Sequence, residues 1–203
     1  MAAYTTIDKP SDYFNTKLYT GTGSSHAITG VGFAPNWVWI KHRNEANPHK
    51  IFDTVRGVGK SLKSNSSDAE ATNEENGYVS AFGSDGFTLV GGSTSSDDVN
   101  KSSGSYVAWN WKAGTSFTND ASSTGIGSID SAGSVNQDAG FSIVSYTGNS
   151  PNATTIKHGL NSIPQMIIFK RLVGAGNFTV YHQSLGNTKG MFLTTTAAAD
   201  TSA

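Results

Sequence analysis

The most informative segment of this sequence is Pro35-Asn36-Trp37-Val38-Trp39-Ile40-Lys41, because a related segment occurs later in the chain. That second stretch is Pro164-Gln165-Met166-Ile167-Ile168-Phe169-Lys170, at an offset of 129 residues (164 − 35). Both are short apolar runs rich in aromatic or β-branched residues, which is typical of β-strands. Because both alternating sets of side chains are apolar, we expect inner strands of a sandwich that are covered on both faces.

The repeat extends on both sides of this stretch. Upstream, Leu18-Tyr19-Thr20-Gly21 matches Ser145-Tyr146-Thr147-Gly148 at an offset of 127 (145 − 18). Downstream, Ile51-Phe52 matches Val180-Tyr181 at the offset of 129. Each copy is much longer than a solenoid repeat, so the pattern indicates duplication of a whole domain.

The rest of the chain has the same strand signature and little sign of helix. Further predicted strands are Lys50–Val55, Gly77–Phe82, Gly86–Val90, Ser105–Trp111, Phe141–Tyr146 and Phe178–Tyr181. The best helix candidate, Ser67–Glu75, has no apolar face, so we expect a surface loop or at most one helical turn there. The sequence therefore predicts an all-β protein of two tandem β-sandwich units of the lectin-like or jelly-roll kind, the second incomplete.

Four segments follow from this interpretation: an N-terminal arm (1–13), a first repeat (14–114), a Ser/Gly-rich linker or edge strand (115–139), and a second repeat truncated at its C-terminus (140–203). At the offset of 129, Ala203 corresponds to Glu74, which precedes the last three predicted strands of the first copy. A sandwich without those strands would expose apolar faces and unpaired strand edges. We therefore expect either a fragment of a longer product or a neighbouring chain that donates the covering strands.

Charge is scarce in this chain. Charged residues make up 14% of the sequence against about 25% in average usage, and the net charge is -1. Such a chain has no basic stripe for phosphates or anionic lipid, which argues against nucleic acid as a partner. It has no cysteine, no signal peptide at Met1–Asp8 and no apolar run of the ~20 residues that a membrane helix needs. We expect no membrane insertion and synthesis in a cytoplasm.

One short motif resembles a phosphate-binding loop. Arg56-Gly57-Val58-Gly59-Lys60-Ser61 follows a predicted strand, but Thr54 stands where the full pattern requires a glycine. No apolar helix follows to direct its N-terminus at a phosphate group. We interpret the segment as a Gly-rich turn.

No pattern points to a catalytic, metal or cofactor site. The histidines lack metal-ligand spacing, so we expect loop or surface positions for them: His26, His42, His49, His158 and His182. The acidic pairs Glu74-Glu75 and Asp97-Asp98 lack the ladder of a calcium loop, so we expect solvated loop charges. No pair of carboxylates stands out for glycoside hydrolysis. We predict no enzyme activity and no cofactor.

Four tryptophans are the remaining candidates for ligand binding: Trp37, Trp39, Trp109 and Trp111. Their rings could stack on sugars. However, they lie in the most strand-like segments, and Met166 and Ile168 replace two of them in the second copy. A core position tolerates that exchange better than a stacking platform does, so we expect core positions.

The motif order of the first copy resembles a domain of unknown function in structural proteins of marine phages, including cyanophage tail-fibre-like proteins. The motifs are Tyr19-Thr20-Gly21, Phe33–Lys41, Phe52–Gly57, Ser64–Glu70, Asp85–Leu89 and Tyr106–Trp111, and the second copy has Gly140–Gly148, His158–Leu160 and Tyr181–Gly190. The resemblance implies a lectin-like sandwich and a place in the virion, and it supplies no site residues.

Two functions fit this resemblance. One is a tail fibre or adhesin subunit that contacts the host surface, and the other is a passive virion scaffold, such as a head decoration protein, head fibre or tail adaptor. Expected partners are other copies of the chain, with a trimer favoured, other virion proteins, and a glycan or protein of the host surface. The sequence identifies no receptor-binding residue.

Overall fold

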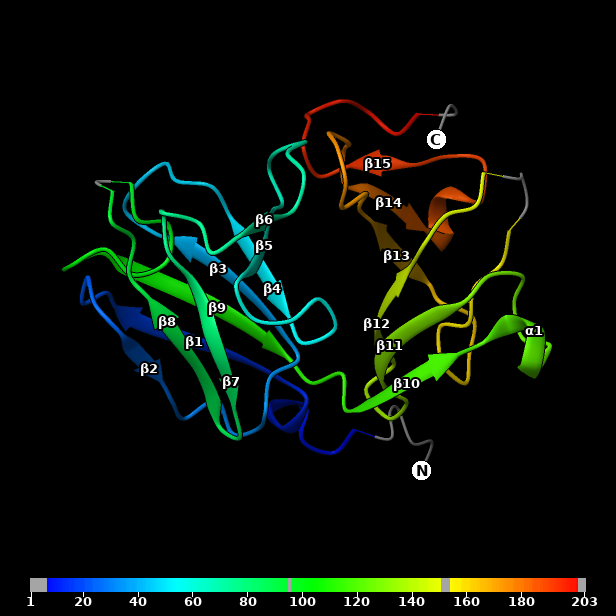
Figure 1. Ribbon diagram of the computed structural model, residues 1–203, viewed down its shortest axis with the longest axis horizontal. Helices are drawn as coiled ribbons and strands as arrows, with labels where there is room; N and C mark the ends of the chain where they lie inside the picture. The colour runs from blue at the N-terminus through cyan, green and yellow to red at the C-terminus, as the bar shows by residue number, and fades with distance from the viewer. Residues whose placement is uncertain (1–6, 95, 151–153, 201–203) are drawn as a thin grey trace.

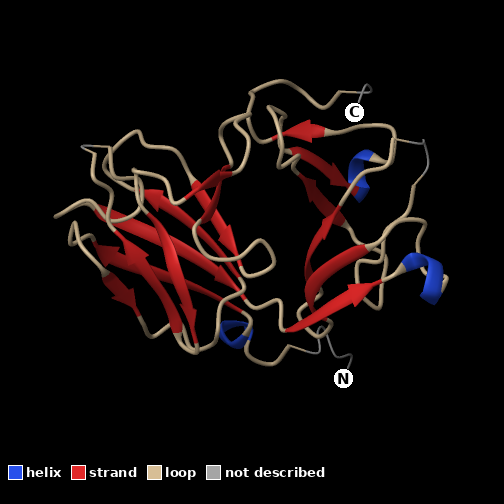
Figure 2. Ribbon diagram, in the orientation of Figure 1, coloured by secondary structure: helices blue, strands red, loops and turns tan. Residues whose placement is uncertain are grey.

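The computed structural model describes residues 7–94, 96–150 and 154–200, which form several antiparallel β-sheets, none of them closed (Figure 2). Within these ranges, helix is confined to three short segments: η1 (Pro10–Asp12), α1 (Ala121–Thr124) and η2 (Gln183–Leu185). The prediction of an all-β protein is confirmed. Within the described ranges, no helix is long and apolar enough to cross a membrane.

Figure 1 shows two halves, each built from two sheets. The strands of the first half are β1 (Phe14–Thr20), β2 (His26–Ile28), β3 (Trp37–His42), β4 (Lys50–Asp53), β5 (Lys60–Lys63), β6 (Ala71–Thr72), β7 (Tyr78–Gly83), β8 (Gly86–Val90) and β9 (Ser105–Trp111). Those of the second half are β10 (Thr115–Asn119), β11 (Ser131–Asn136), β12 (Phe141–Tyr146), β13 (Met166–Phe169), β14 (Thr179–His182) and β15 (Met191–Phe192).

In the first half, a six-stranded sheet of order β1-β9-β3-β4-β5-β6 faces a three-stranded sheet of order β2-β8-β7. The core between them contains side chains from both sheets, among them Val38, Ile40 and Phe52 from the larger sheet and Phe87 and Leu89 from the smaller one. Alternation along β3 explains this core, because Val38 and Ile40 point inward while Trp37 and Trp39 point to the opposite, outer face.

The second half contains two three-stranded sheets, of order β10-β11-β12 and β13-β14-β15. The β13–β14–β15 pairing reproduces the β3–β4–β5 pairing residue for residue. Met166 pairs with His182 as Trp37 pairs with Asp53. Val180 pairs with Met191 as Ile51 pairs with Leu62. The offset of 129 seen in the sequence is therefore also the offset of the strand registers.

The two halves meet on the outer face of the six-stranded sheet. Phe178 is buried there in a second cluster with Ile51 and Leu62, against which Trp37, Trp39, Ile168 and Leu172 pack. Farther along the same face, Phe141 of β12 lies 6.0 Å from the ring of Trp37 and 6.1 Å from that of Trp111. Trp37, Trp39 and Trp111 are therefore half-buried at the contact between the halves, and Trp109 packs against Trp39 at 6.0 Å. None of the four belongs to the core of the first half.

Several strands coincide with their predicted ranges, and others were missed. Gly86–Val90, Ser105–Trp111 and Phe141–Tyr146 were predicted with the observed bounds. The segment 115–139, predicted as a linker or edge strand, forms edge strand β10, helix α1 and the whole of central strand β11. Ser67–Glu75 contains no helix and contributes only the two residues of β6. Of the predicted N-terminal arm, residues 1–6 lie outside the described residues.

Candidate functional site

The acidic pairs that were expected to be solvated are instead largely buried. Asp97 and Asp98 are 2% and 0% exposed. Asp98 Oδ2 lies 3.3 Å from the ammonium group of Lys50, which is itself fully buried and donates a hydrogen bond to Glu74. Lys63 adds a second cation 3.3 Å from Glu74 Oε1. This ion cluster fastens β4 and β5 to two loops, so these carboxylates have a structural role; only Glu75 has the expected exposed position.

Asp97 stabilises the loop that leads into β9. Its Oδ1 accepts hydrogen bonds from the backbone N–H groups of Val99 and Asn100, at 3.0 and 2.7 Å. Its backbone oxygen accepts a hydrogen bond from the hydroxyl of Tyr106. The pKa of Tyr106 is raised by burial. The pair Asp97-Asp98 was therefore misjudged from sequence, because a charged dipeptide does not reveal that its loop is folded into the core.

The histidines are dispersed, and one of them departs from the expected surface position. His42 is fully buried at the end of β3, where its ring stacks on Tyr106 at 4.4 Å. Burial lowers the pKa of His42. Among the described residues, no group of three or more His, Cys, Asp or Glu side chains could hold a metal ion.

The segment that resembles a phosphate-binding loop forms a turn that leads into strand β5. Its cations are engaged elsewhere. Arg56 pairs with Asp53 at 2.5 Å, and Lys60 donates a hydrogen bond to Thr72 at 2.8 Å. Because its cations are paired in this way, the turn serves to connect β4 to β5 and to stabilise both strands.

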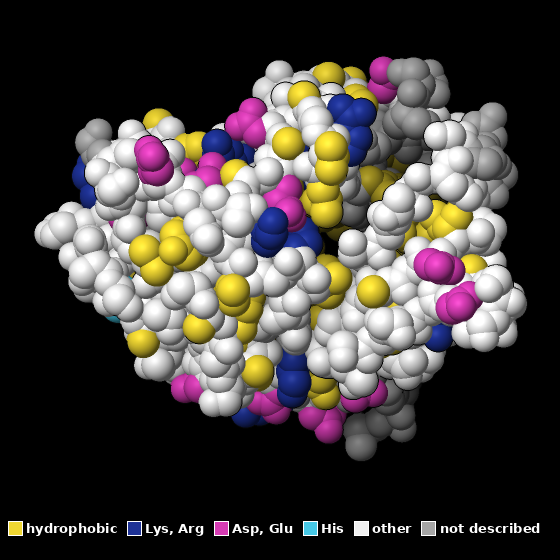
Figure 3. Space-filling view, viewed as in Figure 1, with side chains coloured by type: hydrophobic (Ala, Val, Ile, Leu, Met, Phe, Trp, Pro, Cys, Tyr) yellow, Lys and Arg dark blue, Asp and Glu magenta, His cyan; other side chains and the backbone are white. Residues whose placement is uncertain are grey.

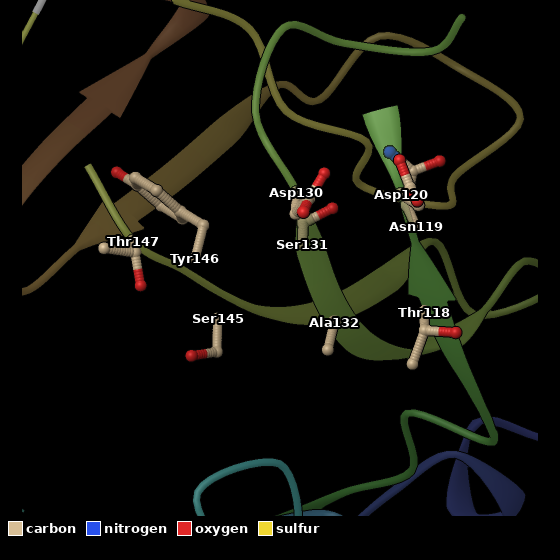
Figure 4. Close-up of a pocket in the computed structure, with 9 residues that line it drawn as sticks. All are labelled: Thr118, Asn119, Asp120, Asp130, Ser131, Ala132, Ser145, Tyr146 and Thr147. Carbon is tan, nitrogen blue, oxygen red and sulfur yellow. The ribbon is translucent and has the colours of Figure 1, made fainter. Parts of the chain in front are cut away.

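A trough that contains several hydroxyl and carboxylate groups lies between the halves and along one face of the β10-β11-β12 sheet. One part is lined by both halves: Asn36, Thr54, Val55, Gly114, Ser116, Phe117, Thr118, Ala132, Gly133 and Ser134. The other part, drawn in Figure 4, is lined by Thr118, Asn119, Asp120, Asp130, Ser131, Ala132, Ser145, Tyr146 and Thr147. Because both parts share Thr118 and Ala132, they form one continuous surface, which we call the trough.

Strand pairing places the residues of the trough. Thr118 of β10 pairs with Ala132 of β11, and Ala132 pairs with Ser145 of β12, so the three side chains form a row across the sheet. Asp120 and Asp130 flank the loop that connects β10 to β11, at the end of this row (Figure 4). The row and the two carboxylates therefore come from three neighbouring strands and one loop.

Some polar atoms of the trough stabilise the loop between β10 and β11, and others can form hydrogen bonds with a ligand. Asp120 Oδ1 accepts hydrogen bonds from the Ser122 hydroxyl and the Ser123 N–H group, and Asp130 Oδ1 accepts one from the Ala121 N–H group at 2.8 Å. Within the described part of the chain, the second carboxylate oxygen of each Asp and the hydroxyls of Thr118 and Ser145 have no hydrogen-bond partner. Two acceptors and two hydroxyls are thus free to bind a ligand.

The trough is acidic, and the carboxylate of Asp120 in its loop stays charged. The hydrogen bonds from Ser122 and Ser123 hold the pKa of Asp120 below its ordinary value. No Lys or Arg lines the trough among the described residues. In Figure 3, charged side chains are scattered over the visible face, which is hollowed between the two halves. The trough therefore suits neutral, hydroxyl-rich ligands better than anions.

Sequence reasoning did not find the trough. The segment that supplies β10 and β11 has the composition of a solvated linker, so none of its residues was a candidate. The one available signal was the short alternating run Ser116-Phe117-Thr118, which is weak beside the strands of the first half. The row of polar side chains exists only after β10, β11 and β12 have paired.

The chain belongs to a protein family described as a domain of unknown function (DUF7483), whose sequence model matches residues 9–203. No curated protein matches the chain in sequence. No solved structure matches it either.

Proposed function

We propose that this protein is a non-enzymatic structural subunit of a bacteriophage virion, most simply a tail fibre or adhesin whose trough binds neutral glycans of the host surface. The observation that carries the binding role is the trough, with its free hydroxyls at Thr118 and Ser145 and free carboxylate oxygens at Asp120 and Asp130. Sugar hydroxyls both donate and accept hydrogen bonds, so such a set complements them. The virion assignment rests on the resemblance of the motifs to phage structural proteins.

The chemistry of the trough favours binding over hydrolysis. A glycosidase needs a carboxylic acid whose pKa is raised, so that it can protonate the leaving group. Asp120 has the opposite shift, because the hydrogen bonds from Ser122 and Ser123 favour its charged form. A carboxylate that stays charged supports a role in holding glycans without cleaving them.

We also propose that the chain is built from two copies of one sandwich unit and that it assembles with itself, as a trimer by preference. The identical registers of β3–β4–β5 and β13–β14–β15 support the duplication. Closed symmetry is the common form of soluble assemblies and supports the oligomer. Native mass spectrometry of the purified protein tests this assembly, and a monomer at micromolar concentration would contradict it.

Glycan binding is tested with an array of neutral and anionic glycans and a matched pair of variants. Asp130→Asn keeps an oxygen for the Ala121 N–H group and replaces the free oxygen by an amide nitrogen, so it should abolish binding without loosening the loop. Asp138→Asn makes the same charge change at an exposed position outside the trough and should leave binding intact. Thr118→Val removes a free hydroxyl at nearly constant volume and should weaken binding.

Labelling of the chain in intact particles tests the virion role. Signal at the tail, together with loss of glycan binding in Asp130→Asn, is the expected result. Signal on the head without glycan binding would favour the passive scaffold. Absence of the chain from particles would contradict both.

A further inference from the structure

The buried ion cluster of the first half places an amine and a carboxyl group in direct contact. The side chains of Lys50 and Asp98 are both fully buried, and the Nζ atom of Lys50 lies 3.3 Å from Asp98 Oδ2. The carboxyl carbon of Asp98 is at most one C–O bond farther away. Chemical attack requires about 3–3.5 Å between the reacting atoms, so a small movement of the lysine side chain suffices.

The carboxyl group of Asp98 is poorly stabilised as an anion. Within the described part of the chain, neither of its oxygens has a hydrogen-bond partner of normal geometry. A buried charge without hydrogen bonds is costly. Burial raises the pKa of Asp98 above its ordinary value, although the nearby charge of Lys50 acts in the opposite direction. Asp98 is therefore the carboxyl group of the cluster that most readily takes up a proton.

Glu74 contacts the same amine but is held in its charged form. It accepts hydrogen bonds from Lys50 and from the hydroxyl of Ser61, and Lys63 Nζ lies 3.3 Å from its Oε1 atom. Burial alone would raise the pKa of Glu74, but the hydrogen bonds from Lys50 and Ser61 hold it below its ordinary value. The cluster thus combines a carboxylic acid, an amine and a charged base that touches the amine.

The backbone fixes the two loops that carry these carboxyl groups. The N–H group of Asp98 donates a hydrogen bond to the Asn76 carbonyl at 2.8 Å, and the N–H group of Gly77 donates one to the Glu74 carbonyl at 3.0 Å. At Gly77, an added Cβ atom would lie 2.7 Å from the side chain of Val99. The turn after Glu74 therefore packs directly against the loop of Asp98, so the three reacting groups are already oriented.

Strand pairing does not explain why a lysine is buried at this position. Phe169 pairs with Thr179 in the second half as Ile40 pairs with Lys50 in the first, so a small polar residue forms the same pair. A buried ion pair loses much of its electrostatic attraction to the cost of removing both charges from water. A reaction that converts the two ions into a neutral group removes this cost.

We propose that Lys50 and Asp98 form a covalent amide bond after the chain has folded, with Glu74 as the proton carrier. Lys50 first passes one proton to Asp98, which gives a neutral amine and a carboxylic acid. The amine nitrogen attacks the carboxyl carbon, and Glu74 takes a proton from that nitrogen. Glu74 then delivers this proton to the departing hydroxyl group. One C–N bond forms, one C–O bond breaks, and one water molecule leaves.

This step needs no cofactor, oxidant or second chain, and Glu74 is regenerated as a carboxylate. The ion cluster is the reactant, and the amide is its product. Because the bond lies where both side chains are fully buried, water has little access to reverse the step. The bond ties β4 to the loop that leads into β9, and it holds these segments together even when the chain unfolds. It is independent of the proposed glycan site, since none of its residues lines the trough.

Intact-mass spectrometry of the 203-residue chain in denaturant tests the bond. We expect a mass lower than that of the sequence by one water molecule. Trypsin should then release one branched peptide that joins residues 44–56 to residues 64–101, because it does not cut after a lysine whose amine is bonded. Fragmentation should place the branch between Lys50 and Asp98. The full mass in the folded chain would overturn the proposal. So would a digest without a branch, as ring closure at Asp85-Gly86 would give.

Variants of the chain test the role of each group. Lys50→Arg keeps a buried cation, and Asp98→Ala removes the acceptor; each should have the full mass while its far-UV circular dichroism stays that of a β-protein. Glu74→Gln should slow bond formation by about a hundredfold, the contribution expected of a proton-transfer group, and freshly purified protein should therefore have the full mass.

The matched control is Glu75→Gln, which makes the same charge change at the exposed neighbouring residue and should form the bond normally. Complete bond formation in Glu74→Gln would overturn the role of Glu74. A branch at Glu74 in the unaltered chain would overturn the choice of Asp98 as the acceptor.

Discussion

Gly21 and Gly148 provide a matched pair of substitutions that tests the packing difference between the two halves. In Gly21→Ala, the new Cβ atom would lie 2.2 Å from the Lys101 carbonyl oxygen, whereas such contacts essentially never fall below 3.0 Å, so the backbone must move by at least 0.8 Å (3.0 − 2.2). That movement strains two hydrogen bonds, from Gly21 N–H to Gly104 at 2.8 Å and from Ser103 N–H to Gly21 at 3.0 Å. In Gly148→Ala, the methyl group meets no atom of the described residues within 4 Å.

The expected magnitudes have opposite signs. Overpacking of this kind costs about 1–3 kcal/mol, which lowers Tm by roughly 2–12 °C in a protein of this size. Gly148→Ala should instead stabilise the protein by about 0.4–1 kcal/mol, because alanine restricts the unfolded chain and does not require a strained φ. Urea unfolding and calorimetry of both variants measure the difference. Equal effects of the two substitutions would refute the interpretation that only the first half packs a loop against this glycine.

Three further substitutions test the ion cluster, the buried histidine and the contact between the halves. Lys50→Met leaves the carboxylates of Glu74 and Asp98 without their buried cation, and urea unfolding at pH 7 should show a loss of about 3–5 kcal/mol. A loss below 1 kcal/mol would contradict a structural role for this cluster. Because burial lowers the pKa of His42 from 6.5, protons bind the unfolded state more readily, so stability should fall as the pH drops below 6.5. His42→Gln should reduce this slope by up to about 1.4 kcal/mol per pH unit, and an unchanged slope would show that other groups cause it. Phe178→Ala removes a side chain that is 1% exposed between the halves and should cost about 3–5 kcal/mol in urea unfolding; a cost within 1 kcal/mol would mean that this cluster contributes little.

Local patterns in the sequence predicted many strands, but the shortest strands contain too few residues to form a recognisable pattern. The strands β8, β9 and β12 contain alternating or apolar runs of five to seven residues, and their bounds were predicted as observed. The strands β6 and β15 have only two residues each, and they form because neighbouring strands offer them an edge. Register was predictable only through the repeat, since the offset of 129 reappears in the pairing of β13 with β14.

The all-β fold, the duplicated motifs and the low charge could be read from the residues alone, because each is a property of residue types and their spacing. Which face of β3 meets which layer depends on the packing of distant segments, which places Val38 in the core and Trp37 at the contact with the second half. The same packing buries Asp98 beside Lys50 and brings Thr118 and Ser145 into one row across a sheet. Alternation specifies two faces for every strand, whereas the segments that cover each face come from far away in the chain.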